Sequence, residues 1–229
     1  MTPKKILAIE TSGKICSVAL TELAPGIITP DKIVCNPIAE YTLYVGNKHD
    51  QFCAELCHRI IKDNELSFEE LDAVAVSIGP GSFTGLRVGV SVAKGLCYHL
   101  KDSSVEARPK LLAVPTMNAL VFNVDLDRKV LAIIPSHNNF VYYQVFNNYW
   151  EAQTEIKFDT LDAALDLYGD DIFITTNYKL PITKSGYVRD FRDISAFMIA
   201  KYGAKMFLEN VFADPVTLQP LYIQDFIPK

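Results

Sequence analysis

The sequence predicts an α/β protein made of two units that share one order of elements, β-β-β-α-β-α. Three observations predict it: short apolar stretches bounded by turn residues, amphipathic helix patterns in each half, and a glycine-rich turn that joins an apolar strand to a helix. The 229 residues suffice for one large or two small domains. We expect units at residues 1–105 and 106–229, tightly packed because no Ser- or Gly-rich linker joins them.

The first half opens with a hairpin and ends with a helix. Its expected strands lie at residues 5–10, 15–20, 32–36 and 73–78, the last an unbroken apolar run typical of a strand buried on both faces. Its expected helices lie at residues 48–62, with Asn47 as cap, and 84–100.

The second half repeats this order. Its expected strands lie at residues 129–134, 141–147, 154–158 and 172–175, and its helices at 161–168 and 193–210, the last capped by Asp193 or Ser195. By analogy, a duplicated unit of this kind is the layout of the actin-like, ribonuclease-H-like (ASKHA) superfamily.

Composition and charge exclude several classes of protein. Hydrophobic residues make up 49% and charged residues 21%, which excludes a disordered chain. No apolar run approaches the ~18 residues of a membrane helix, and no signal-peptide core follows the start, so we expect a soluble, cytoplasmic protein without membrane contact. The net charge of −5 predicts that any contact with nucleic acid is indirect or uses a local basic patch.

The five cysteines, at positions 16, 35, 53, 57 and 97, lie in apolar stretches and are expected to be buried, reduced thiols. His49, Cys53 and Cys57 would share one helix face, a spacing that raises the possibility of zinc. Three ligands along one helix cannot complete a tetrahedron alone, so we expect no metal and no cofactor.

A glycine-rich loop at residues 79–85 is the densest motif. Backbone N–H groups at a helix start attract anions, which makes this loop and the first hairpin turn a possible anion or nucleotide site. The candidate contacts are Glu10, Thr11, Ser12, Gly79, Gly81, Ser82 and Thr84. The loop lacks the P-loop spacing, and an ordinary turn with Ser82 or Thr84 as N-cap is the favoured interpretation.

The two helices of the first half carry unusual surfaces. Gly85, Gly89 and Ala93 form a row of small residues that indicates close approach of another backbone, either of this chain or of a second protein. The helix at residues 48–62 has a wide apolar face that could serve the same purpose. The candidate partner interface comprises His49, Phe52, Cys53, Leu56, Ile60, Leu86, Gly89, Val90, Ala93 and Cys97.

The stretch GPGSFTGLRVGVSVAKGL (residues 79–96), with LAIETSG at residues 7–13, resembles the TsaB (YeaZ) family over residues 6–119. His49 and the segment at residues 219–222 match the family more locally. The resemblance implies a non-catalytic, dimerising subunit on an ATPase-derived fold. Its implied partners are the TsaD paralogue, which it binds and activates, the TsaE ATPase, and a second copy of itself in isolation. The complex transfers a threonylcarbamoyl group to the adenosine next to the tRNA anticodon, and the first two helices form the dimer surface.

The chain departs from that family at residues 135–137, Pro-Ser-His instead of the common Asp-Ala-Arg, and at Gln224 instead of an arginine. The second hairpin therefore offers neither a carboxylate nor a glycine to a metal-bound phosphate, and we expect no enzyme activity. The alternative is an actin-like nucleotide-binding protein or hydrolase that uses the Glu10 hairpin and the Gly79–Gly85 loop. A metallopeptidase is excluded, because no two of the four histidines are three or four residues apart.

Overall fold

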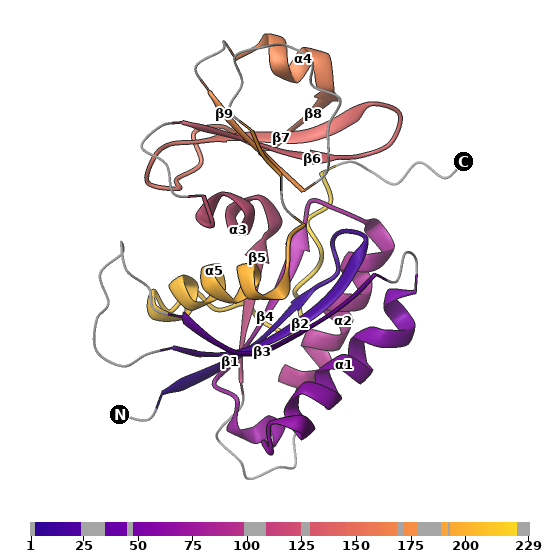
Figure 1. Cartoon of the computed structure of the whole chain (residues 1–229), viewed down its shortest axis with the longest axis vertical. Coiled ribbons are helices and arrows are strands. Elements are labelled where there is room, and N and C mark those ends of the chain that lie inside the picture. The colour runs from indigo at the N-terminus through magenta and orange to yellow at the C-terminus, as the bar shows by residue number, and fades with distance from the viewer. Residues whose placement is uncertain are drawn as a thin grey trace.

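The computed structural model describes residues 3–23, 35–44, 48–98, 109–124, 129–168, 172–177, 189–191 and 193–223. In these residues, two five-stranded sheets lie one above the other, with helices between them and on their outer faces (Figure 1). The sheets have the same mixed topology, with a central strand that pairs antiparallel on one side and parallel on the other. The predicted two-unit α/β architecture is confirmed.

The first sheet contains the amino-terminal hairpin. Its strands, in spatial order, are β3 (Cys35–Tyr44), β2 (Ile15–Leu23), β1 (Lys4–Glu10), β4 (Ala73–Gly79) and β5 (Lys110–Pro115). Alternate residues of β1 serve opposite faces, as the period of two in a strand requires. Leu7 and Ile9 join one hydrophobic cluster, whereas Ile6 and Ala8 join another.

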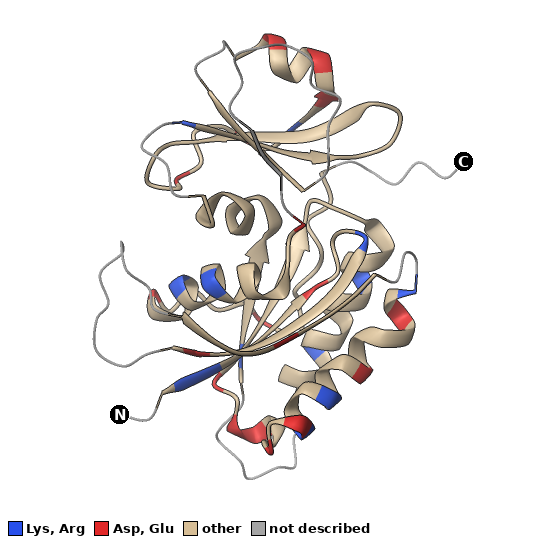
Figure 2. Ribbon diagram, viewed as in Figure 1, with Lys and Arg blue, Asp and Glu red and all other residues tan. Residues whose placement is uncertain are grey.

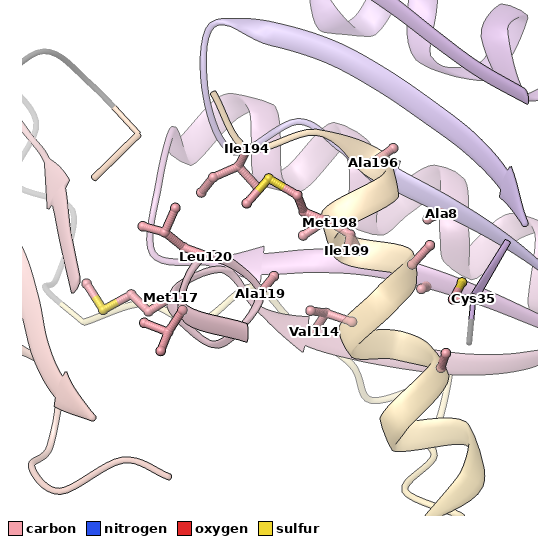
Figure 3. Packing of buried hydrophobic residues seen from close by; sticks show 14 of the residues in the cluster. Ala8, Cys35, Val114, Met117, Ala119, Leu120, Ile194, Ala196, Met198 and Ile199 are labelled. Carbon is pink, nitrogen blue, oxygen red and sulfur yellow. The ribbon is translucent and has the colours of Figure 1, made fainter. Parts of the chain in front are cut away.

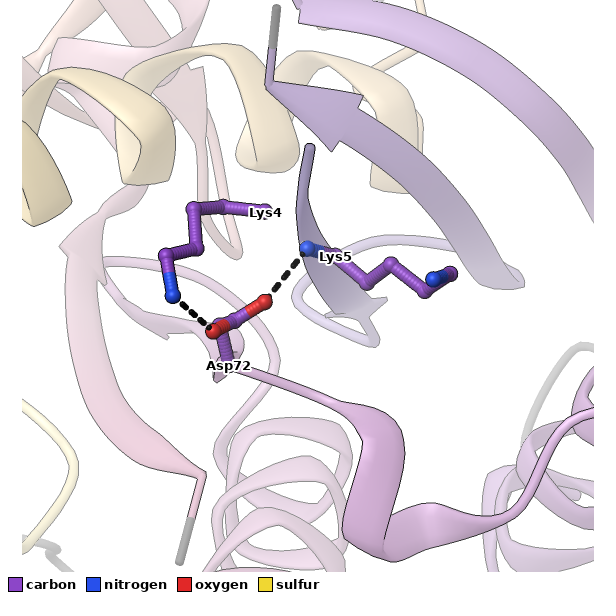
Figure 4. Close-up of polar contacts among 3 residues, drawn as sticks. All are labelled: Lys4, Lys5 and Asp72. Carbon is purple, nitrogen blue, oxygen red and sulfur yellow. Dashed lines mark hydrogen bonds and ion pairs between the residues drawn. The ribbon is translucent and has the colours of Figure 1, made fainter. Parts of the chain in front are cut away.

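Asp72 holds the starts of β1 and β4 together. Its backbone N–H donates to Lys5 O at 2.9 Å, and its carboxylate accepts from Lys5 N at 2.9 Å and from Lys4 Nζ at 2.7 Å (Figure 4). These bonds pin the parallel register that begins with Ile6 opposite Ala73.

Helices cover both faces of the first sheet. The helices α1 (His49–Asp63) and α2 (Phe83–Cys97) lie side by side on one face, and α5 (Ala196–Leu208) lies on the other (Figure 1). The short helix η1 (Phe68–Glu70) leads into β4 and begins with a capping box formed by Ser67 and Glu70.

The second sheet repeats the pattern with shorter elements. Its strands, in spatial order, are β10 (Arg189–Phe191), β9 (Phe173–Thr176), β6 (Val130–Pro135), β7 (Phe140–Phe146) and β8 (Lys157–Thr160). Helix α4 (Leu161–Asp166) packs on its outer face, and α3 (Thr116–Phe122) lies between the sheets.

One hydrophobic core connects the two sheets through α3 and α5. Met117 and Leu120 of α3 are fully buried, and Leu120 lies toward Ile194 and Met198, which flank the start of α5 (Figure 3). Because this cluster also takes residues from β1, β4 and β6, the two sheets share buried surface through the helices between them.

Several elements differ from the sequence prediction. β5 and α3 were missed, since they are short and form a stretch that looked like a junction. β3 starts at Cys35 and runs on to Tyr44, and α2 ends at Cys97 because Tyr98 is extended. Helix α5, predicted for the second unit, packs on the first sheet. Asn47 and the boundary between residues 105 and 106 lie outside the described residues, and the division into 1–105 and 106–229 stays a prediction.

Within the described part of the chain, every helix is too short or too polar to cross a bilayer.

Candidate functional site

The glycine-rich loop closes onto the turn between β1 and β2. Ser82 N donates to Ser12 O at 2.7 Å, which ties the loop to the turn. The Ser82 hydroxyl in turn accepts from Gly85 N at 3.3 Å, so Ser82 is the N-cap of α2, one of the two residues predicted for that role. Thr84, the other candidate, is exposed in the first turn of α2.

The row of small residues on α2 fits against the same turn. A Cβ on Gly85 would overlap the Thr11 carbonyl oxygen, and one on Gly89 would overlap Thr11 Oγ1. A Cβ on Gly81 would lie 2.5 Å from Ser12 O. Of the two neighbours left open by the sequence, the one within the chain is confirmed: these glycines let α2 approach the first hairpin.

Glu10 is fully buried at the end of β1, and its Oε1 accepts from Ser12 N. Burial raises the pKa of this carboxyl from 4.5 to about 7, and the hydrogen bond from Ser12 N opposes this rise only in part. Glu10 Oε2, Thr11 Oγ1, Ser12 Oγ and Ser77 Oγ are buried without a hydrogen-bond partner. The hairpin end is therefore a closed, polar spot inside an otherwise apolar core.

This arrangement leaves little for an anion to bind. Gly79 N donates to Thr116 Oγ1 at 3.1 Å, and the Ser82 and Gly85 amides donate to oxygens of the loop and the turn. The structure brings the candidate contacts Glu10, Thr11, Ser12, Gly79, Gly81 and Ser82 close to one another. They come together by packing on one another, and three amides of the loop, those of Gly79, Ser82 and Gly85, already have acceptors in the chain.

The second hairpin has a different end. Phe140 N donates to His137 O at 3.0 Å, and Asn138 and Asn139 have φ of 52° and 63°, which makes a type I′ turn. In the parallel pairs, Ile9 lies opposite Val76 and Ile133 opposite Thr176. Counted from these pairs, buried Ile134 occupies the position of Glu10.

The residues predicted to bind a partner are largely inside the chain. Phe52 is half-buried, and the other nine are buried: His49, Cys53, Leu56, Ile60, Leu86, Gly89, Val90, Ala93 and Cys97. Six of them belong to the hydrophobic cluster of the first sheet: Cys53, Leu56, Ile60, Val90, Ala93 and Cys97. His49 Nε2 lies 3.1 Å from Ile15 O of β2. The apolar stripes of α1 and α2 are therefore buried against the first sheet and are not available to a partner. The argument from an exposed apolar face for an interface at these positions was wrong.

All five cysteines are free thiols, and the prediction that they are buried is confirmed. Cys53 contacts the thiols of both Cys16 and Cys57. The pKa values of Cys53 and Cys16 are raised, so these two thiols stay protonated. Among the described residues, no three of His, Cys, Asp and Glu form a group that could hold a metal ion.

Sequence reasoning missed the course of the carboxyl-terminal segment, which crosses α2. Leu221 N donates to Ile78 O at 2.7 Å, and Lys94 Nζ donates to Val216 O at 3.2 Å and Leu218 O at 3.0 Å. The Tyr222 ring lies 5.3 Å from that of Phe83. The motif at residues 219–222 was the signal that could have placed this segment beside the glycine-rich loop.

We compared the sequence and the fold with those of known proteins. The family model for TsaD, tRNA N6-adenosine threonylcarbamoyltransferase, matches residues 43–200. A Buchnera aphidicola protein named tRNA threonylcarbamoyladenosine biosynthesis protein TsaB is 29% identical over 167 residues, 71% of this chain and 69% of that protein. The chain belongs to the TsaB (YeaZ) family.

Other members of the TsaB family match over shorter stretches. The Haemophilus influenzae protein is 32% identical over 60% of this chain, and the alignment spans only about half of that relative, 52%. Two solved structures from Pseudomonas aeruginosa, one titled YeaZ and one described as similar to peptidase YEAZ, give TM-scores of 0.74 and 0.75 at 19% identity, each covering 96% of this chain and all of the other. They support the actin-like fold of the TsaB family for this chain.

Proposed function

We propose that the chain serves the biosynthesis of threonylcarbamoyladenosine in tRNA as a non-catalytic subunit, which binds and activates a TsaD paralogue. Membership of the TsaB family supports the pathway. The observation that carries the non-catalytic role is the unequal pair of hairpins, with Glu10 at one end and Ile134 at the other.

An actin-like phosphotransferase needs polar groups from both hairpins to hold metal-bound phosphates between its lobes. Ile134 supplies no metal ligand, and the Gly79, Ser82 and Gly85 amides of the glycine-rich loop already donate within the chain. Glu10 is fully buried, and among the described residues no carboxylate joins it in a group that could hold a metal ion. These features argue against a nucleotide-binding protein or hydrolase at this site.

The outward side of α1 and α2 is the proposed docking surface. On α2, half-buried Val88, Val92 and Leu96 lie at intervals of four residues beside exposed Ser91 and Gly95. Exposed residues of both signs lie along α1 (Figure 2), in the order Asp50, Glu55, Arg59, Lys62 and Asp63, and such a mixture suits a specific protein partner better than a nucleic-acid backbone. The TsaD paralogue occupies this surface in the complex, and a second copy of the chain occupies it in isolation. TsaE joins that complex, and tRNA is reached through it.

Gly95 allows a test that separates docking from folding. A Cβ at this position would meet nothing within 4 Å, so a larger side chain fits the isolated fold and projects into the partner. In sedimentation velocity with TsaD, we expect Gly95→Ala to retain the complex and Gly95→Leu to lose it, with both variants at least as stable as the native chain. Full association of Gly95→Leu would contradict the proposed surface.

Two assays test the remaining roles. In a reconstituted modification reaction, the native chain should raise the activity of TsaD, whereas Gly95→Leu should leave it at the level without the subunit. Calorimetry with ATP and magnesium should give no saturable heat. A magnesium-dependent binding heat that Glu10→Gln removes would instead favour a nucleotide-binding protein.

A further inference from the structure

A cavity of about 440 Å³ opens between α3, α5 and the connection from β7 to β8, away from both hairpin ends. Its volume is within the range of small-ligand pockets, roughly 300–1,000 Å³. Its walls combine three aromatic rings with charged groups: Tyr149, Trp150, Glu151, Tyr202, Lys205 and Glu209. Neither the predicted interface nor the glycine-rich loop includes any of these residues.

The connection that forms one wall is rigidly built. Asn147 Oδ1 accepts from Tyr149 N at 2.9 Å and from Glu151 N at 3.0 Å, and Asn147 Nδ2 donates to Glu151 Oε2 at 2.8 Å. Trp150 has a φ of 61°, which bulky residues rarely adopt, and its indole N–H donates to Val124 O at 3.2 Å. The turn thereby presents Tyr149 with 67% of its surface exposed.

The opposite wall already holds a cation of the chain itself. Lys205 Nζ lies 5.9 Å from the centre of the Tyr202 ring and 2.6 Å from Glu209 Oε1. The Tyr202 hydroxyl accepts from Asn118 Nδ2 at 3.1 Å, which fixes the ring. An ammonium above an aromatic face and beside a carboxylate is the arrangement expected where a pocket favours positive charge.

The charges of the pocket do not balance. Lys205 neutralises Glu209, whereas the Glu151 carboxylate accepts a hydrogen bond from the neutral amide of Asn147. We propose that this pocket binds an organic cation, with a guanidinium group stacked on Tyr149 and paired with Glu151. A guanidinium suits this site better than an ammonium, because the planar group can stack on the tyrosine ring and at the same time donate two hydrogen bonds to a carboxylate.

Such a cation could be a free amino acid or an arginine side chain of a protein. The two sources share the guanidinium and differ in the groups around it. A free amino acid adds a carboxylate, which can pair with Lys205 but lies near Glu209, whereas a side chain within a peptide adds only neutral amides. Their relative affinities therefore identify the source.

Trp150 makes the test direct, since it is the only tryptophan among the 229 residues and lines the pocket. We would titrate the native chain with N-acetyl-arginine methylamide and with its neutral analogue N-acetyl-citrulline methylamide, and follow tryptophan fluorescence. We expect a saturable change with the arginine compound in the millimolar range and none with citrulline. Tighter binding of free arginine would assign a metabolite, and tighter binding of the blocked compound a protein side chain.

Matched variants localise the effect. Glu151→Gln and Tyr149→Ala should each weaken binding about fivefold. Glu155→Gln removes the same charge from an exposed position nearby that does not line the pocket, and should bind as the native chain does. Thermal melting of each variant checks folding. The proposal is overturned by equal responses to arginine and citrulline, by a titration without saturation, or by equal losses in Glu151→Gln and Glu155→Gln.

Discussion

The β1–β2 and β6–β7 hairpins occupy equivalent places in two sheets of the same topology, yet their ends are built differently. The first ends in buried Glu10 and lies under α2, whose glycines fit against Thr11. The second ends in buried Ile134 and an exposed type I′ turn at Asn138 and Asn139. The comparison indicates that the two copies keep their sheets for stability but that only the first keeps a polar, tightly packed end.

Breaking the contact between α2 and the first hairpin should have the largest effect. In Gly85→Ala the new methyl group would overlap a backbone oxygen of Thr11, which cannot rotate away as a side chain can. We expect a loss of about 3 kcal/mol or more in the free energy of unfolding, measured by urea denaturation.

The matched control for that variant is Gly95→Ala on the same helix, where a Cβ meets nothing within 4 Å. It should gain up to about 1 kcal/mol from helix propensity. Equal free energies of unfolding for the two variants would mean that α2 does not pack tightly against the first hairpin at Gly85.

The buried carboxyl of Glu10 should make the first hairpin end sensitive to pH. The pKa of Glu10 is about 7 in the folded protein, above the unfolded value of 4.5. The contribution of this group to the free energy of unfolding is therefore complete below pH 4.5 and is lost as the pH rises through 7. The loss amounts to up to about 3 kcal/mol, from ~1.36 kcal/mol for each pKa unit.

Glu10→Gln should flatten this part of the stability profile and unfold at higher urea than the native chain at pH 8. Thermal or urea melts at several pH values measure both effects. Parallel profiles for the variant and the native chain would assign the pH dependence to other groups.

The sequence was enough to predict the two-unit order and the core strands, because period and turn residues are local properties. Ser82 could be predicted as a cap for the same reason. The sequence could not show which segment packs against a given helix face. The spacing of Gly89 indicated a close neighbour, but only the fold identifies that neighbour as Thr11. The apolar stripe through Leu56 likewise could not tell the sheet from a partner, since both offer the same apolar contact.

The pocket at Trp150 could not be predicted from the sequence. Its walls come from α3, α5 and the connection after β7, three segments brought together only by tertiary packing. No spacing rule links residues so far apart in the chain, and the left-handed conformation at Trp150 contradicts what a bulky residue predicts.

Two hydrogen bonds tie the start of helix α5 to the first sheet, and weakening them should have a moderate effect. Ala196 N donates to Ser17 Oγ at 3.1 Å, and Phe197 N donates to Glu40 Oε1 at 2.9 Å, so strands β2 and β3 cap the first turn of α5. Ser17→Ala should cost about 1–2 kcal/mol, because it leaves a buried N–H without an acceptor. Ser17→Thr, which keeps the hydroxyl, should cost less in the same urea experiment; equal losses would point to packing rather than capping.

The turn of the second hairpin should tolerate change best. Asn138 has a left-handed φ of 52°, is exposed, and lies at the first central position of the type I′ turn. Glycine adopts this conformation freely, so Asn138→Gly should change the free energy of unfolding by less than about 0.5 kcal/mol. Alanine does not, and Asn138→Ala should cost about 1 kcal/mol. If both substitutions instead cost as much as Gly85→Ala, the second hairpin end would be held by contacts as tight as those of the first, and the contrast between the two lobes would not hold.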